Sequence, residues 1–114
     1  MNEVLSVLQD FAQQCNHNER LRKMNRDWSR LVELLATDTG VTYWLRSDQG
    51  QITAGVGEIG GVDLKILAAE DVLRDVFSGV MTPTEPYNAG DLLVKGHQDD
   101  LMRLDIITLL IWGE

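Results

Sequence analysis

The spacing of apolar residues changes near Gly40, and this change limits the folds that the chain can adopt. Before Gly40 apolar residues recur every three to four positions, which is the spacing of an amphipathic helix. After it they alternate with polar residues, as at Val41 and Leu45, which is typical of a strand with one buried face. Helical spacing returns at 68–79 and at 99–112. This order predicts an α+β fold with helices on one face of an antiparallel sheet.

Two helices are predicted before the sheet, at 3–14 and 19–37, with a break at 16–18. The polar face of the second helix carries half of the basic residues in the chain: Arg20, Arg22, Lys23, Arg26 and Arg30. Such a cluster attracts anionic head groups or an acidic partner, or it pairs with acidic residues of the same chain.

The predicted sheet begins with an antiparallel meander, because apolar and polar residues alternate in three consecutive segments. These segments are 41–46, 52–56 and 62–66. Pro83 and Pro86 predict a loop over 81–87, and 91–95 reads as a further short strand. The absence of repeats and linkers predicts a single domain over 1–114, with N-terminal helices at 1–38 and the sheet with its helices at 39–114.

Composition restricts the partners of the chain. It has 114 residues and a formal net charge of -8, which disfavours binding to phosphate backbones, so no nucleic-acid partner is expected. The most apolar stretch, 106–112, is far shorter than the roughly 20 residues of a transmembrane helix. The N-terminus lacks the features of a signal peptide, and the single cysteine indicates a reducing compartment. We therefore expect a cytoplasmic protein without a transmembrane segment.

The residues give little indication of catalysis or metal binding. Gly55–Gly60 has the spacing of a dinucleotide fingerprint, but the segment that follows alternates like a strand, so the required helix is missing. Cys15 and His17 are too few to hold zinc, and no nucleophile, base and orienting group come together in the sequence. We expect no enzyme, no catalytic residues, no metal and no cofactor.

The last helix is apolar on nearly every side between Ile106 and Trp112, unlike a helix with one solvated face. It is expected to lie in the core, to line a ligand cavity, or to cover a partner or membrane surface. Its β-branched residues also permit a strand.

Four motifs in the second half occur in the order of a known family. They are Val62–Ile66, Ala69–Leu73, Phe77–Pro83 with a G-x-x-x-P turn, and Gly90–Gly96 with G-x-L-x-V-x-G. Together with the apolar last helix they resemble the sterol carrier protein type-2 (SCP2-like) domain over roughly residues 40–112. His97–Gln98 departs from the family, which often has an acidic residue there, and the chain lacks a Ser-Lys-Leu ending.

The resemblance implies a five-stranded, mostly antiparallel sheet covered by helices on one face, with an apolar tunnel between sheet and helices. It also implies that a set of apolar residues faces this tunnel and binds the ligand: Val72, Val76, Phe77, Leu92, Val94, Leu101, Leu104 and Leu109. The expected member is a small bacterial or archaeal protein, with a fatty acid, acyl chain or other lipid as ligand rather than a sterol.

Two functions are therefore kept open. The first is non-enzymatic binding of a small hydrophobic ligand, as in a lipid carrier, with each buried methylene contributing about 0.8 kcal/mol. The second is an accessory or scaffold role, in which the apolar last helix docks a partner enzyme or a second copy as a homodimer. An interior with space favours the first, and an interior filled by side chains favours the second.

Residues 57–114 hold eleven acidic and four basic residues, so the acidity lies mainly in the half with the resemblance.

Overall fold

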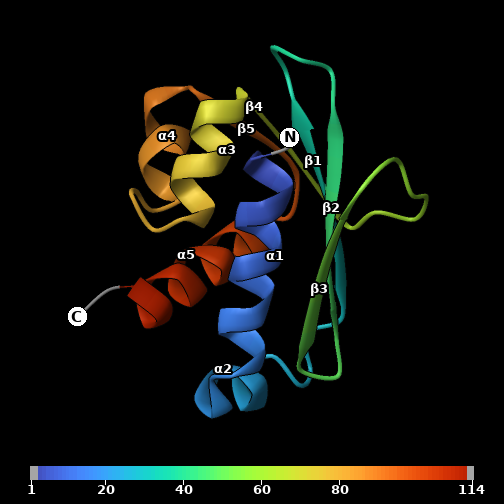
Figure 1. Ribbon diagram of the computed structural model, residues 1–114, viewed down its shortest axis with the longest axis vertical. Helices are drawn as coiled ribbons and strands as arrows, with labels where there is room; N and C mark the ends of the chain where they lie inside the picture. Colours follow the sequence, from blue (N-terminus) through green and yellow to red (C-terminus); the bar gives the residue numbers. More distant parts are fainter. Residues whose placement is uncertain (1–2, 113–114) are drawn as a thin grey trace.

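The computed structural model describes residues 3–112, which form a five-stranded sheet with the helices on one side (Figure 1). The elements in chain order are α1 (Glu3–Asn16), α2 (Glu19–Met24), β1 (Arg30–Ala36), β2 (Thr42–Asp48), β3 (Gln51–Val56), β4 (Leu64–Ala68), α3 (Glu70–Phe77), α4 (Thr84–Ala89), β5 (Leu92–Gly96) and α5 (Gln98–Trp112). The predicted α+β class is confirmed. None of the described helices is long and apolar enough to cross a membrane.

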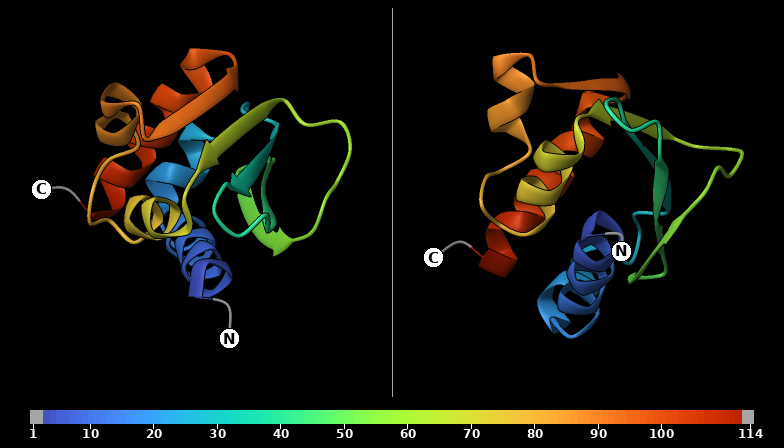
Figure 2. Two further views of the ribbon diagram at one scale, coloured as in Figure 1. Left: turned by 90° about the horizontal axis from the view of Figure 1, so that it is seen from above. Right: turned by 45° about the horizontal axis from the view of Figure 1, so that its top comes forward.

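The strand order is β3-β2-β1-β4-β5, and one of the four strand pairs is parallel. Strands β2 and β3 form the expected hairpin, but the prediction that the next strand extends it is wrong. Instead β4 pairs in parallel with β1, in a register that places Val32 beside Leu64. A parallel partner needs a crossover rather than a tight turn. Residues 57–63 supply it, on the side of the sheet away from the helices (Figure 2).

The predicted helix over 19–37 is also wrong, because α2 ends at Met24 and β1 begins at Arg30. The part of the chain expected to be N-terminal helices, 1–38, thus contains the central strand. Strand β1 has apolar residues on both faces. Val32, Leu34 and Ala36 are buried on one face, and Leu31 and Leu35 are half-buried on the other, on either side of Glu33. Such a short apolar run satisfies a helical spacing as well as an alternating one, so periodicity alone does not separate them.

The segment with both prolines contains a helix instead of the predicted loop. Pro86 is the third residue of α4, in the first turn, where its missing N–H has no intrahelical partner to lose. The helix stops at Gly90, which has φ +86°, a left-handed conformation that glycine adopts without steric cost. The other predicted helices are confirmed with small shifts at their ends, as α1, α3 and α5.

The core lies between the inner face of the sheet and helices α1, α3 and α5 (Figure 1). Alternation along each strand points one set of side chains at the helices, as predicted for β2 with Tyr43 and Leu45. Helix α1 contributes Val4, Leu8 and Phe11, the stripe expected from its spacing. The glycine-rich stretch 55–60 opens no helix, since it ends β3 and leads through the crossover to β4.

Candidate functional site

The eight residues expected to line a tunnel do not share one environment. Five of them are buried in the core: Val76, Phe77, Leu92, Leu101 and Leu104. Val72 and Val94 are half-buried. Leu109 does not face the interior, because 49% of its surface is exposed on the outer side of α5. Because this helix is apolar all round, its sequence gives no indication of which side is buried. The expectation that Leu109 faces the interior therefore had no support from the pattern of the helix.

An apolar cavity between α1, α5 and strands β1 to β3 is the nearest feature to the expected tunnel. Its apolar lining residues are Phe11, Trp28, Val32, Leu45, Ile52, Leu104 and Ile107. The volume is about 10 Å³, which holds roughly one water-sized sphere, whereas ligand pockets measure roughly 300–1,000 Å³. An open tunnel, as expected from the resemblance, is therefore not present at this position. We call this space the inner cavity.

Only Leu104 belongs to both the predicted set and the lining of the inner cavity. Sequence patterns did indicate the buried side of α1 and of the strands, which supply Phe11, Leu45 and Ile52. They placed Val32 on a helix, so its position beside these residues was missed. The strand alternation was thus a better guide to the cavity than the family motifs.

Two of the three tryptophans, Trp28 and Trp112, pack in or against the core, and the third lies outside it. Trp28 is buried and lines the inner cavity. Trp44 points to the opposite face of the sheet, where its ring lies over Gly55 on the neighbouring strand. The missing side chain of Gly55 therefore creates no space in the interior. The space that it leaves lies on the outer face of the sheet and is filled by the Trp44 ring.

Trp112, in the last turn of α5, closes the interior at one end. Its ring stacks on Phe11 with a centroid distance of 5.9 Å, and Phe11 also meets Phe77 edge to face at 5.1 Å. The backbone of Gly79 supports the same ring, since a Cβ atom there would lie 2.5 Å from Trp112 Cγ. Phe11 lines the inner cavity, whereas Trp112 lines an open pocket of about 140 Å³. The Phe11–Trp112 pair thus lies between the inner cavity and this outer pocket.

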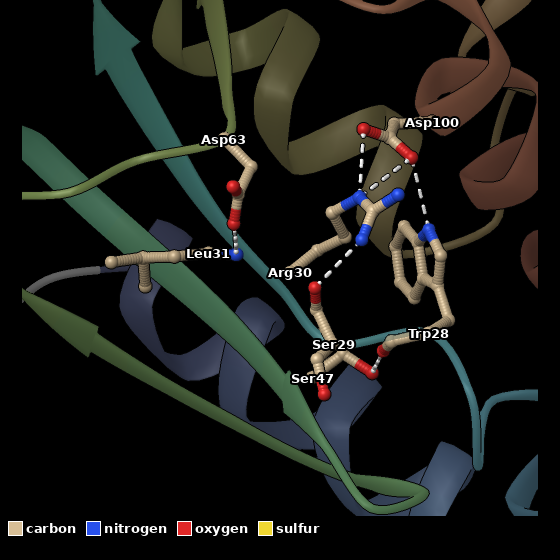
Figure 3. A network of polar contacts seen from close by, with 7 residues as sticks. All are labelled: Trp28, Ser29, Arg30, Leu31, Ser47, Asp63 and Asp100. Carbon is tan, nitrogen blue, oxygen red and sulfur yellow. Dashed lines mark hydrogen bonds and ion pairs between the residues drawn. The ribbon is translucent and has the colours of Figure 1, made fainter.

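The first turn of α5 is held by a buried carboxylate (Figure 3). Asp100 accepts a hydrogen bond of 3.0 Å from Trp28 Nε1, and Arg30 Nε lies 3.2 Å from both carboxylate oxygens. Arg103, one turn along, stacks on Trp28 and donates to the carbonyl oxygen of Met24. Polar contacts therefore fix the first half of α5 to β1 and to the segment before it.

The outer side of α5 carries a row of exposed apolar side chains, which we call the α5 row. It consists of Met102, Ile106 and Leu109, exposed to 50%, 46% and 49%. Their spacing of four and three residues places them on one face of the helix. Val80 lies at the same outer pocket as Leu109 and is 70% exposed. This surface has no covering element within residues 3–112.

The candidate nucleophile and metal-binding residues, Cys15 and His17, lie in different environments. Cys15 is buried, and this burial raises the pKa of its thiol to about 12, which makes it a poor nucleophile. His17 is exposed beside it in sequence, and residues 3–112 contain no group of three or more potential metal ligands. Of the predicted basic face, Arg20, Arg22, Lys23 and Arg26 are exposed around α2, while Arg30 is turned to Asp100.

No protein-family model and no curated protein sequence matches the chain. Solved structures do match its fold. A structure titled UbiJ-SCP2 ubiquinone synthesis protein has a TM-score of 0.78 at 14% identity, over 95% of this chain and 94% of that one. Sterol carrier protein 2 from Yarrowia lipolytica in its apo form has a TM-score of 0.65 at 14% identity, over 97% and 91%.

Palmitated SCP2L2 from Aedes aegypti has a TM-score of 0.68 at 12% identity, over 95% of this chain and 93% of that one. These likenesses extend over nearly the whole of both chains. The fold is therefore that of sterol carrier protein 2, as the motifs of the second half indicated.

Proposed function

We propose that the protein binds one aliphatic chain, without chemical conversion, in the space between α1, α5 and the sheet. The observation that carries this proposal is the inner cavity, an apolar space walled by both layers and separated from an outer pocket by the Phe11–Trp112 pair. The fold supports it, because SCP2L2 from Aedes aegypti has the same fold and its solution structure is of the palmitated protein.

Binding requires the inner cavity to open, since about 10 Å³ does not hold an acyl chain. The end of α5 is the part best placed to move. Its first turn is held by the hydrogen bond between Asp100 and Trp28. In its last turn, Trp112 is only partly buried and packs on Phe11 and Gly79. Displacement of the Trp112 ring would join the outer pocket to the space beside Phe11.

Palmitic acid is expected to bind with a dissociation constant on the order of 10 µM, because burying about 14 methylenes at ~0.8 kcal/mol each outweighs an association cost of several kcal/mol. Trp112→Ala is expected to strengthen this binding by up to about tenfold, since it raises the population of the open state. Displacement of a fluorescent fatty acid and native mass spectrometry measure both effects.

Met102→Ala is the matched control, because Met102 is an exposed apolar residue of the same helix that lines neither the inner cavity nor the outer pocket. Trp112→Leu provides a second variant that keeps apolar packing on Gly79 if the alanine variant unfolds. The proposal is wrong if folded wild type and both Trp112 variants show no displacement and carry no lipid after purification.

The exposed α5 row favours a second function, docking of a partner on the outer side of α5. The filled interior agrees with this alternative. Ile106→Asp is expected to abolish docking and to leave palmitic acid binding unchanged, because Ile106 is exposed and does not line the inner cavity. A parallel loss of both activities would show that Ile106 acts through the fold and not through a docking surface.

A further inference from the structure

Two surface pockets lie along the seam between α4 and α5, and together they form what we call the α4–α5 groove. The first measures about 420 Å³ and lies between Tyr87 and Met102. The second is the outer pocket beside Leu109 and Val80. Between them Asp105 Oδ1 accepts hydrogen bonds from both the backbone N–H and the hydroxyl of Thr84, which pins α4 to α5. The groove is thus built on helices held together by specific contacts.

The α5 row forms an apolar ridge beside this groove. Met102 and Leu109 line its two pockets, and Ile106 lies between them on the same helical face. From Met102 to Leu109 the row extends about 10 Å along the helix axis, which is two helical turns. A surface of this length matches the apolar stripe of one short amphipathic helix, whose anchors recur at three, four and seven residues.

The charge around the groove is of one sign. Asp99 lines the first pocket and Glu85 the second, and neither lining includes a lysine, arginine or histidine. Asp105 adds a third carboxylate at the seam. The one basic residue of α5, Arg103, is turned toward Trp28 and the Met24 carbonyl. The ridge therefore lies beside a rim that attracts positive charge.

We propose that the α4–α5 groove binds an amphipathic, basic helix of a partner protein, with its apolar stripe on the α5 row and its lysines or arginines opposite Asp99, Glu85 and Asp105. This inference rests on the second proposed function and names its partner. A second copy of the chain would bring the same acidic rim against itself. An anionic lipid surface would be repelled by the same carboxylates.

The test uses three labelled 18-residue peptides and the full chain. One peptide has leucines at helical spacing and lysines elsewhere, the second replaces every lysine by glutamate, and the third is a scramble of the first. In anisotropy titrations at 50 mM salt the lysine peptide is expected to bind at least about tenfold more tightly than the other two. Its affinity is expected to fall several-fold at 300 mM salt, where exposed charges are screened.

Ile106→Asp is expected to weaken binding of the lysine peptide at least about tenfold, because it places a charge in the middle of the apolar ridge. Val56→Asp is the matched control: Val56 is a comparably exposed apolar residue, but it lies at the end of β3, outside the groove. Asp99→Lys is expected to weaken the lysine peptide and to strengthen the glutamate peptide, which a loss of folding would not do.

Four results would overturn this inference. They are equal binding of the lysine peptide and its scramble, wild-type affinity in Ile106→Asp, a wild-type dimer that Ile106→Asp dissociates in sedimentation, and attachment of the wild type to anionic vesicles that Ile106→Asp abolishes. Palmitic acid binding is measured in the same variants. Its retention when peptide binding fails separates the docking function from the binding of an aliphatic chain.

Discussion

Asp100→Ala is expected to lower the free energy of unfolding by about 3 kcal/mol, one of the two largest effects we expect in this chain. The Asp100 carboxylate is 4% exposed and is shared by Trp28 Nε1 and Arg30 Nε. Its removal leaves the indole N–H of Trp28 buried without an acceptor and Arg30 without its counter-charge. Arg30 is partly exposed and regains water, which keeps the loss at the lower end of the range for buried pairs.

Urea denaturation followed by circular dichroism measures this loss. Asp99→Ala is the matched control, because Asp99 is the neighbouring acidic residue in the same helical turn but is exposed. A surface substitution of this kind changes stability by less than about 0.5 kcal/mol. Equal stability of the two variants would show that the Asp100 contacts do not hold α5 to β1.

Raising the pH from 8 to 11 is expected to destabilise the protein by about 2–3 kcal/mol through Cys15 alone. Burial raises the pKa of this thiol from 9.0 to about 12. Below pH 9 the thiol is protonated in both the folded and the unfolded chain, so it adds no pH dependence. Between pH 9 and pH 12 the unfolded chain loses the proton while the folded chain keeps it, and unfolding becomes progressively more favourable.

Tyrosines and lysines titrate in the same range, so the measured quantity is the difference between wild type and Cys15→Ala. The alanine variant begins with a lower stability because of the space that it leaves, but its further loss between pH 8 and pH 11 is expected to be smaller by that 2–3 kcal/mol. Parallel stability curves for the two proteins would mean that the thiol is not desolvated as the structure indicates.

Local sequence patterns were sufficient to predict the helices and strands that have one buried face and one solvated face. The stripe of α1 and the alternation of β2 gave both the type of element and the side that is buried, as Phe11 and Leu45 show. The motifs from Val62 to Gly96 indicate the fold without any information on strand pairing. These signals are local, because each depends on the contrast between apolar and polar neighbours within a few residues.

The wrong predictions concern elements in which apolar residues occupy more than one face. Strand β1 has leucines on both faces, so its spacing also fits a helix, and without β1 the parallel partner of β4 was missing. Helix α5 is apolar all round, so Leu109 was placed inside when it lies outside. The volume of the interior depends on how Trp28, Trp44 and Trp112 are oriented, and no periodicity contains that information.

The parallel pairing of β1 with β4 also governs the order in which the chain can fold. Strands β1, β2 and β3 are joined by short connections and can pair locally, but this leaves one edge of the most apolar strand open until residues 64–68 arrive. Asp100 then has to reach Trp28, 72 positions away in the sequence. Contacts between such distant parts of the chain slow folding, because loop entropy is lost before the contacts form. On the ribosome the exposed edge of β1 persists until most of the chain has been made, and this strand is therefore the point at which nascent chains would be most prone to associate.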